Sequence, residues 1–246
     1  MRNITVRIAL VILFLASAGH ALAQRGQLSD EAVARAVTER LTSHDVTGVA
    51  VSVESRIVTL RGTVTPLWLT ERAAEQALKV TDVVTVLNDV TVARGESDEV
   101  LAGLVAAQLR RYVFLTIFDD ADIEVDRGVV TLTGRVTMPY KAEAFADLAA
   151  RVPGVQAVRN EVKTLPVSTF DDQLRYAVAR GIYGDELFAH YALQVNPPVH
   201  IIVEHGNVTL TGVVFSEVER RKAEAIARST FAVMSVTNKL RIETED

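Results

Sequence analysis

The stretch Val58-Thr59-Leu60-Arg61-Gly62 is the first of three copies of the pattern Val-Thr-Leu-x-Gly in this chain. The other copies are Val130-Thr131-Leu132-Thr133-Gly134 and Val208-Thr209-Leu210-Thr211-Gly212. An Asn follows each Gly at a distance of 26 positions, as Asn88, Asn160 and Asn238. Agreement in register along a chain is the signature of repeated structural units. The sequence therefore predicts three related units in tandem.

The first 23 residues have the features of a secretory signal peptide. Arg2 and Arg7 supply positive charge, Ile8–Ala16 is apolar, and Ala21-Leu22-Ala23 matches a cleavage site, so we expect cleavage after Ala23. A membrane anchor is the alternative, but the apolar run is shorter than the about 20 residues that a spanning helix needs. We therefore expect an exported, periplasmic protein.

The composition excludes several classes of site. The chain has 0 Cys, which excludes disulfides, thiolate zinc sites and thiol nucleophiles. Without Arg2 and Arg7 the formal net charge falls from -5 to -7. Proteins that bind nucleic acid usually carry a basic surface, so we expect no nucleic-acid partner.

Each unit shows the same order of helix and strand patterns. In the first unit, Ser29 followed by Asp30 and Glu31 is typical of a helix N-terminus. Alternating apolar residues then predict a strand hairpin that turns at Glu54-Ser55-Arg56. A second helix after Pro66 and a third alternating segment complete the unit. The other helices are expected near 98–113, 139–151 and 216–230, and the last strands over 84–92, 155–165 and 233–242.

The predicted fold class is α+β, with three small α-β-β-α-β units, each a three-stranded sheet covered by two helices. We expect the units over residues 28–93, 97–165 and 169–243. The third unit contains an insert of six residues, which falls within 183–198. The repeated Gly suits a bulge or a close helix approach late in the second strand, and the repeated Asn suits hydrogen bonds to local backbone.

This pattern resembles the BON domain family. The resemblance rests on Val-Thr-Leu-x-Gly, the Ala-rich helix that follows it, and the Val-x-x-Val-x-Asn run that ends at each repeated Asn. It covers Ser29 to Glu243, although the family's Gly before the last strand is present only at Gly154. The resemblance implies a periplasmic, envelope-associated protein linked to osmotic and envelope stress, with phospholipid as the ligand. It offers no catalytic motif to carry over.

Several residues that could bind a metal or take part in catalysis also have purely structural explanations. Three of the His residues, at 190, 200 and 205, fall in the third unit, but their spacing matches no common metal motif, and His200 is expected to point away from the core. The cluster of Asp119, Asp120, Asp122 and Glu124 fits a solvated acidic loop better than an EF-hand. No nucleophile elbow or phosphate-binding loop is present. We therefore expect no catalytic residues, no metal and no cofactor.

The aromatic and basic residues give the candidates for a lipid interface. Trp68 and Tyr140 occupy equivalent positions on the second helices, and Leu67 and Leu69 flank Trp68. Aromatic rings of this kind favour a lipid headgroup layer, or they pack against a neighbouring unit. The basic run of Arg220, Arg221 and Lys222 suits anionic headgroups, or it forms an ion-paired helix face. The rings at 112, 114, 118 and 145 are expected in cores or at contacts between units.

The function that these observations favour is not enzymatic. We expect a periplasmic envelope protein of the osmotic stress response that binds phospholipid or membrane surfaces. The alternative is a periplasmic module for protein–protein interaction or scaffolding, with other envelope proteins as partners.

Overall fold

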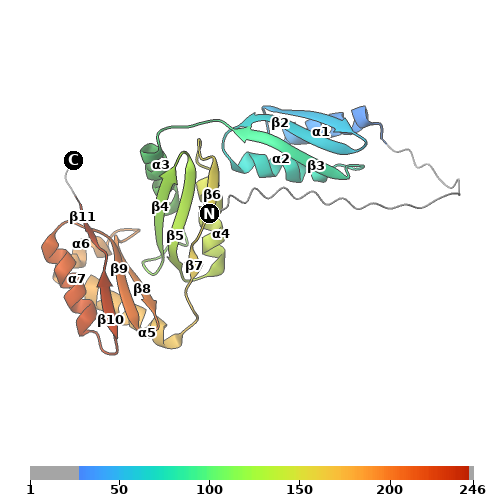
Figure 1. The fold of residues 1–246 in the computed structure, drawn as a ribbon. Coiled ribbons are helices and arrows are strands. Elements are labelled where there is room, and N and C mark those ends of the chain that lie inside the picture. The colour runs from blue at the N-terminus through green and yellow to red at the C-terminus, as the bar shows by residue number, and fades with distance from the viewer. Residues whose placement is uncertain (1–27, 244–246) are drawn as a thin grey trace, which may run out of the picture.

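The computed structural model describes residues 28–243, which form three α+β units (Figure 1). The expected signal peptide and its cleavage after Ala23 lie outside these residues. The first unit contains α1 (Asp30–Ser43), β1 (Val49–Glu54), β2 (Ile57–Val64), α2 (Trp68–Leu78) and β3 (Thr85–Val92).

The second unit repeats this order as α3 (Asp98–Arg110), β4 (Asp120–Asp126), β5 (Val129–Val136), α4 (Pro139–Ala150), β6 (Ala157–Asn160) and β7 (Lys163–Thr164). The third unit comprises α5 (Thr169–Tyr183), η1 (Glu186–Phe188), α6 (Ala189–Ala192), β8 (Val199–Glu204), β9 (Asn207–Val214), α7 (Glu217–Ser229), β10 (Ser235–Asn238) and β11 (Arg241–Ile242). The insert of the third unit therefore holds two short helical turns that the sequence patterns did not indicate. The prediction of three tandem α-β-β-α-β units is confirmed.

Every unit has the same mixed sheet. The first two strands form an antiparallel hairpin, and the last strand pairs in parallel with the second, as β1–β2–β3 does in the first unit. In the other two units the last strand is interrupted just after its Asn, so that β6 and β7 both pair with β5. The prediction of one continuous last strand is therefore right only for the first unit.

Each unit has its own hydrophobic core. In the first, Val33 and Val37 of α1 and Ala73 of α2 pack against Val58 and Leu60 of β2, and all five side chains are buried. Both helices thus cover one face of the sheet. Burial of each Val or Leu side chain contributes about 1.5–3 kcal/mol before the entropy of folding is counted.

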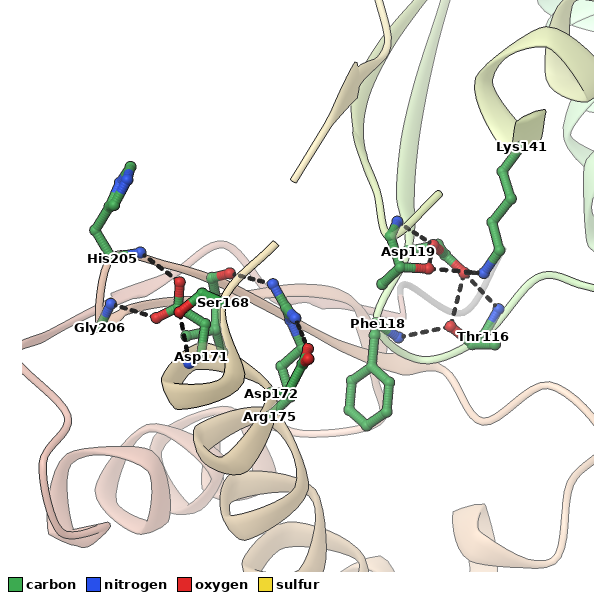
Figure 2. Close-up of polar contacts among 12 residues, drawn as sticks. Thr116, Phe118, Asp119, Lys141, Ser168, Asp171, Asp172, Arg175, His205 and Gly206 are labelled. Atoms are coloured by element: carbon green, nitrogen blue, oxygen red, sulfur yellow. Dashed lines mark hydrogen bonds and ion pairs between the residues drawn. The ribbon is translucent and has the colours of Figure 1, made fainter. Parts of the chain in front are cut away.

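The first helix of each unit also binds the hairpin turn. The carboxylate of Asp98 accepts hydrogen bonds from the backbone N–H groups of Arg127 at 2.7 Å and Gly128 at 2.8 Å. Both turn residues have positive φ, and so do both turn residues in the other units, including Arg56 in place of Gly. Equivalent bonds join Asp30 to residues 55 and 56, and Asp171 to residues 205 and 206 (Figure 2).

The repeated Gly and Asn have structural roles that differ in part from those expected. A Cβ at Gly134, where φ is +129°, would lie 2.2 Å from the carbonyl oxygen of Asp120. The group that requires Gly is therefore the backbone of the neighbouring strand, and the prediction of a close helix approach is wrong. The side chain of Asn160 accepts from the N–H of Val162 at 3.2 Å, as expected of a local bond, and also donates to the carbonyl of Ala142 on α4 at 2.8 Å. Asn88 and Asn238 make the same pair of bonds.

Candidate functional site

Two exposed aromatic rings meet on the second unit, and two further exposed apolar residues lie close to them in the sequence. Val113, Phe114, Met138 and Tyr140 are 84, 56, 51 and 50 % exposed, respectively, and we call them the aromatic patch. The ring of Phe114 contacts the ring of Tyr140 edge-on at a centroid distance of 6.2 Å. Single exposed apolar residues are ordinary on protein surfaces, whereas a contiguous group is typical of a contact surface.

A chain of rings fixes the aromatic patch to the core. Phe114 contacts Tyr112 at 5.6 Å between ring centroids, and Tyr112 contacts the fully buried Phe145 at 6.0 Å. Because these edge-to-face contacts continue into the core, the exposed rings project from a rigid base.

A buried ion pair joins the two segments that carry the aromatic patch. Asp119 is 0 % and Lys141 4 % exposed, and the Lys141 Nζ lies 2.6 Å from the Asp119 carboxylate. The same carboxylate accepts hydrogen bonds from the backbone N–H and hydroxyl groups of Thr116 and Thr137, so it links the connector after α3 to the start of α4 (Figure 2). Burial raises the pKa of Asp119, but the hydrogen bonds from Lys141 and the threonines outweigh it and lower the pKa below its ordinary value.

The interpretation of the acidic cluster as a solvated loop is wrong for two of its members. Asp119 is buried as described, and Asp120 is half-buried, accepting a hydrogen bond from the Thr211 hydroxyl of the third unit at 2.8 Å. Burial raises the pKa of Asp120. Only Asp122 and Glu124 are exposed to solvent.

The connector after α3 also forms the junction with the third unit. The carbonyl of Ile117 accepts a hydrogen bond from the N–H of Ile201 at 2.7 Å, and the rings of Phe118 and Tyr176 meet at 5.2 Å. His200 turns away from the buried Val199 and reaches the carbonyl of Asp119. Among residues 28–243, no three His, Asp or Glu side chains gather as metal ligands would.

The predicted positions of the aromatic rings are confirmed except for one. Phe145 lies in the core, Tyr112 packs against that core, and Phe118 lies at the junction with the third unit. Phe114 is instead exposed. Phe114 lies in the connector that follows α3, where its ring contacts Tyr112 and Tyr140 and stays 56 % exposed.

Trp68 lies at the junction of the first two units. The guanidinium groups of Arg72 and Arg151 lie over its indole at 5.1 and 4.8 Å from the ring centroid. Leu67 packs against the core of the second unit, and Leu69 packs against the core of its own unit. Arg151 follows the last turn of α4 and Tyr140 lies in its first turn, so these two residues are roughly 16 Å apart along that helix. Trp68 and Tyr140 therefore lie near opposite ends of α4.

The basic run on α7 is ion-paired. Arg220 and Arg221 both reach the carboxylate of Glu217, at 2.6 and 2.7 Å. Hydrogen bonds from Arg220 and then Arg221 lower the pKa of Glu217 to about 2. Lys222 lies 3.0 Å from Asp185, which the insert supplies. The structure thus places these three cations on a helix face with carboxylate partners, in a different unit from Trp68 and Tyr140.

Sequence reasoning missed the Val113, Phe114 and Met138 members of the aromatic patch. A signal was present, because Val113 and Phe114 follow two arginines at the end of a helical pattern, and Met138 precedes Pro139 at the start of the next. Among residues 28–243, no helix combines the length and hydropathy needed to cross a membrane.

Comparisons with known proteins support the division of the chain into three repeated units. The BON domain model matches residues 29–94, 97–166 and 189–244, so the third match begins after α5. Osmotically-inducible protein Y of Escherichia coli (strain K12) is 31 % identical over 130 residues, which are 50 % of this chain and 61 % of that protein. The chain thus spans about three fifths of the length of this curated relative.

Two solved structures align over most of their length. CdsD, a structural protein of the type III secretion system of Chlamydia trachomatis, is 15 % identical, with 85 % of this chain and 91 % of CdsD covered and a TM-score of 0.24. The periplasmic domain of the inner membrane protein PrgH of S. typhimurium is 14 % identical, with 83 and 98 % covered and a TM-score of 0.21. Scores this low carry no weight for fold or function. The three segments matched by the family model, which together span most of the chain, show that this protein belongs to the BON domain family.

Proposed function

We propose that this protein is a non-enzymatic periplasmic protein of the osmotic stress response that binds phospholipid surfaces through the aromatic patch. The family and the name of the Escherichia coli relative support the cellular setting. The single observation that carries the binding surface is the exposed contact between Phe114 and Tyr140. The exposed Val113 precedes Phe114 in the chain, and the exposed Met138 lies two residues before Tyr140.

The composition of the aromatic patch suits a membrane interface. Tyr has an apolar ring and a polar hydroxyl, and such residues are favoured at the level of lipid headgroups. Arg110 and Arg111, which precede the patch at the end of α3, are both exposed and add positive charge. Apolar side chains inserted beside basic ones are typical of proteins that lie on anionic membranes.

The rigidity of the aromatic patch supports the same proposal. The connector that carries Phe114 and the helix start that carries Tyr140 are both held by the Asp119 carboxylate. A surface that is already ordered loses little conformational entropy when it binds, so more of the burial energy appears as affinity.

Co-sedimentation with phosphatidylglycerol vesicles at low salt tests this proposal. We expect the mature chain to sediment with these vesicles, and the double variant Phe114→Ser/Tyr140→Ser to remain in the supernatant. The matched control is Phe231→Ser, which removes a 93 % exposed ring from the third unit. Absence of wild-type binding, or equal binding by the double variant, would contradict the proposal.

The same assay separates the aromatic patch from the other lipid-interface candidates. Trp68→Ala and Arg221→Glu change the junction of the first two units and the ion-paired face of α7. If either variant abolishes sedimentation while Phe114→Ser/Tyr140→Ser does not, the membrane surface lies at that site instead.

A second function, in protein–protein interaction, is favoured by one observation. β3 is an uninterrupted edge strand of 8 residues, whereas the equivalent strands of the other units are broken. An open edge can pair with an extended segment of another protein. Crosslinking from β3 in the envelope fraction tests this alternative, which predicts protein adducts that disappear in Leu87→Pro.

A further inference from the structure

A cavity of about 380 Å³ lies at the junction of the second and third units, apart from the aromatic patch. One side is formed by Ala106 and Leu109 of α3 and by Ala121 and Ile123 of β4, with Phe145 of α4 also lining it. Ala106 of α3 and Ala121 of β4 both have small side chains, so space remains between this helix and this edge strand.

The insert of the third unit forms the opposite wall. Gln194, Asn196 and Pro198 line the cavity, together with Val213 of β9. The Asn196 side chain donates a hydrogen bond to the carbonyl of Arg110 at 2.6 Å, which fastens the insert to the end of α3. The other two units have no such insert, so this cavity is specific to the junction of the second and third units.

Among the residues that the structure describes, the cavity lining holds more unpaired positive charges than unpaired negative ones. The cations that line the cavity are Arg110 and Arg241, and the imidazole of His200 is a further polar group of the lining. Among residues 28–243, neither arginine forms an ion pair with a carboxylate. Of the two acidic lining residues, Asp119 is paired with Lys141, whereas Asp120 accepts a hydrogen bond from the uncharged Thr211 hydroxyl. Over the described part of the chain, the lining therefore holds two arginines without an ion-pair partner and one such carboxylate, Asp120.

We propose that this cavity binds a single-chain amphiphile with an anionic head group. The apolar chain would lie against Leu109, Ile123 and Val213, and the two guanidinium groups would hold the head. Arginine binds carboxylates and phosphates through paired hydrogen bonds, which suits either head group. The volume lies near the lower end of the about 300–1,000 Å³ typical of ligand sites, so it suits one acyl chain and not a two-chain phospholipid.

This proposal does not depend on membrane binding by the aromatic patch. Calorimetric titration of the mature chain with decanoate and with decyl phosphate, below their micelle-forming concentrations, tests it. We expect saturable binding of at least one of these ligands at one site, and binding at least about tenfold weaker for decanol and for decyltrimethylammonium, which share the chain but lack the anion.

Variants locate the site. Arg110→Gln and Arg241→Gln should each weaken binding by about tenfold, because each removes a charged hydrogen-bond donor. The control Arg159→Gln makes the same change on β6, where the side chain is exposed and outside the cavity. Ala106→Leu should fill the cavity and abolish binding, and if this variant does not fold, the two charge variants still decide the question.

Two outcomes would overturn the proposal. The first is the absence of saturable binding of both anionic amphiphiles to the wild-type chain. The second is binding that Arg110→Gln and Arg241→Gln leave unchanged. Vesicle co-sedimentation of Arg241→Gln should equal that of the wild type, so failure at the cavity and failure at the aromatic patch remain distinguishable.

Discussion

The replacement Asp119→Asn should destabilise the second unit by about 3 kcal/mol, the lower end of the cost of removing one member of a buried ion pair. The geometry explains why the near-isosteric amide does not substitute. One carboxylate oxygen accepts from the Thr116 N–H at 2.9 Å, the Thr116 hydroxyl at 2.7 Å and the Lys141 Nζ at 2.6 Å. The other accepts from the N–H and hydroxyl of Thr137 at 2.8 and 2.9 Å.

An Asn side chain can satisfy only one of these two sets of donors. Its carbonyl can accept from Thr137, but its amide N–H₂ group then faces the Lys141 ammonium and the Thr116 N–H, which are also donors. The ammonium stays buried without its counter-charge, which is the costly state. For a unit of this size, 3 kcal/mol corresponds to a decrease in Tm of roughly 12 to 24 °C.

Urea denaturation followed by circular dichroism, with differential scanning calorimetry, measures this change. Asp122→Asn is the control, because it removes an exposed carboxylate from β4, which begins directly after Asp119, and should change the unfolding free energy by less than about 0.5 kcal/mol. A loss below about 1 kcal/mol for Asp119→Asn would refute the reasoning, since the pair would then contribute no more than an ion pair on the surface.

The pH dependence gives an independent check. The pKa of Asp119 in the folded chain is lower than its ordinary value of 3.8, because its hydrogen bonds outweigh the effect of burial. The unfolded chain therefore binds the proton more tightly, and the carboxylate stabilises the fold above pH 3.8. This contribution should disappear as the pH falls from 3.8 through the lower folded pKa, and Asp119→Asn should lack that part of the acid dependence.

Three further perturbations test other parts of the structure. Asp98→Ala removes the acceptor for the N–H groups of Arg127 and Gly128, and urea denaturation should show a loss of about 2 kcal/mol, while the neighbouring Glu99→Ala should have little effect. Gly134→Ala would place a Cβ 2.2 Å from the Asp120 carbonyl oxygen and should lower the unfolding free energy by more than about 2 kcal/mol. The control Gly103→Ala, where a Cβ would meet nothing within 4 Å, should stabilise α3 by about 0.5–1 kcal/mol. Equal effects of the two variants in thermal unfolding would contradict this account. Glu217→Gln removes the shared partner of Arg220 and Arg221, so co-sedimentation with anionic vesicles should increase if the basic run meets lipid, while Glu143→Gln, an exposed change on α4, leaves those pairs intact.

The sequence predicts the repeated elements well because their determinants are local. Each copy of Val-Thr-Leu-x-Gly places alternating side chains on a strand that is half buried, and Ser29 caps α1 as its position suggests, accepting from the Ala32 N–H at 3.3 Å. The Gly was recognisable as a residue with a structural role, although the group that requires it was not. That group is a carbonyl on the neighbouring strand, and only the strand register shows it.

Contacts between distant residues were not predictable in the same way. The Asp that binds the hairpin turn lies 25 positions before the first turn residue in the first unit, 29 in the second and 34 in the third, so no fixed spacing marks it. Asp119 could not be separated from its acidic neighbours, because its burial depends on Lys141, which lies on the next helix. The aromatic patch was missed for a related reason, because the contact between Phe114 and Tyr140 joins two separate segments of the chain.

The position of Trp68 has a spectroscopic consequence. The chain has 1 Trp, and its indole lies beside Arg72 of its own unit and Arg151 of the next. Its fluorescence therefore responds to separation of the first two units even when each unit stays folded, whereas the junction of the second and third units contains no indole. A shift of the emission maximum that precedes the loss of far-ultraviolet ellipticity during denaturation would show that the first unit separates before any sheet unfolds.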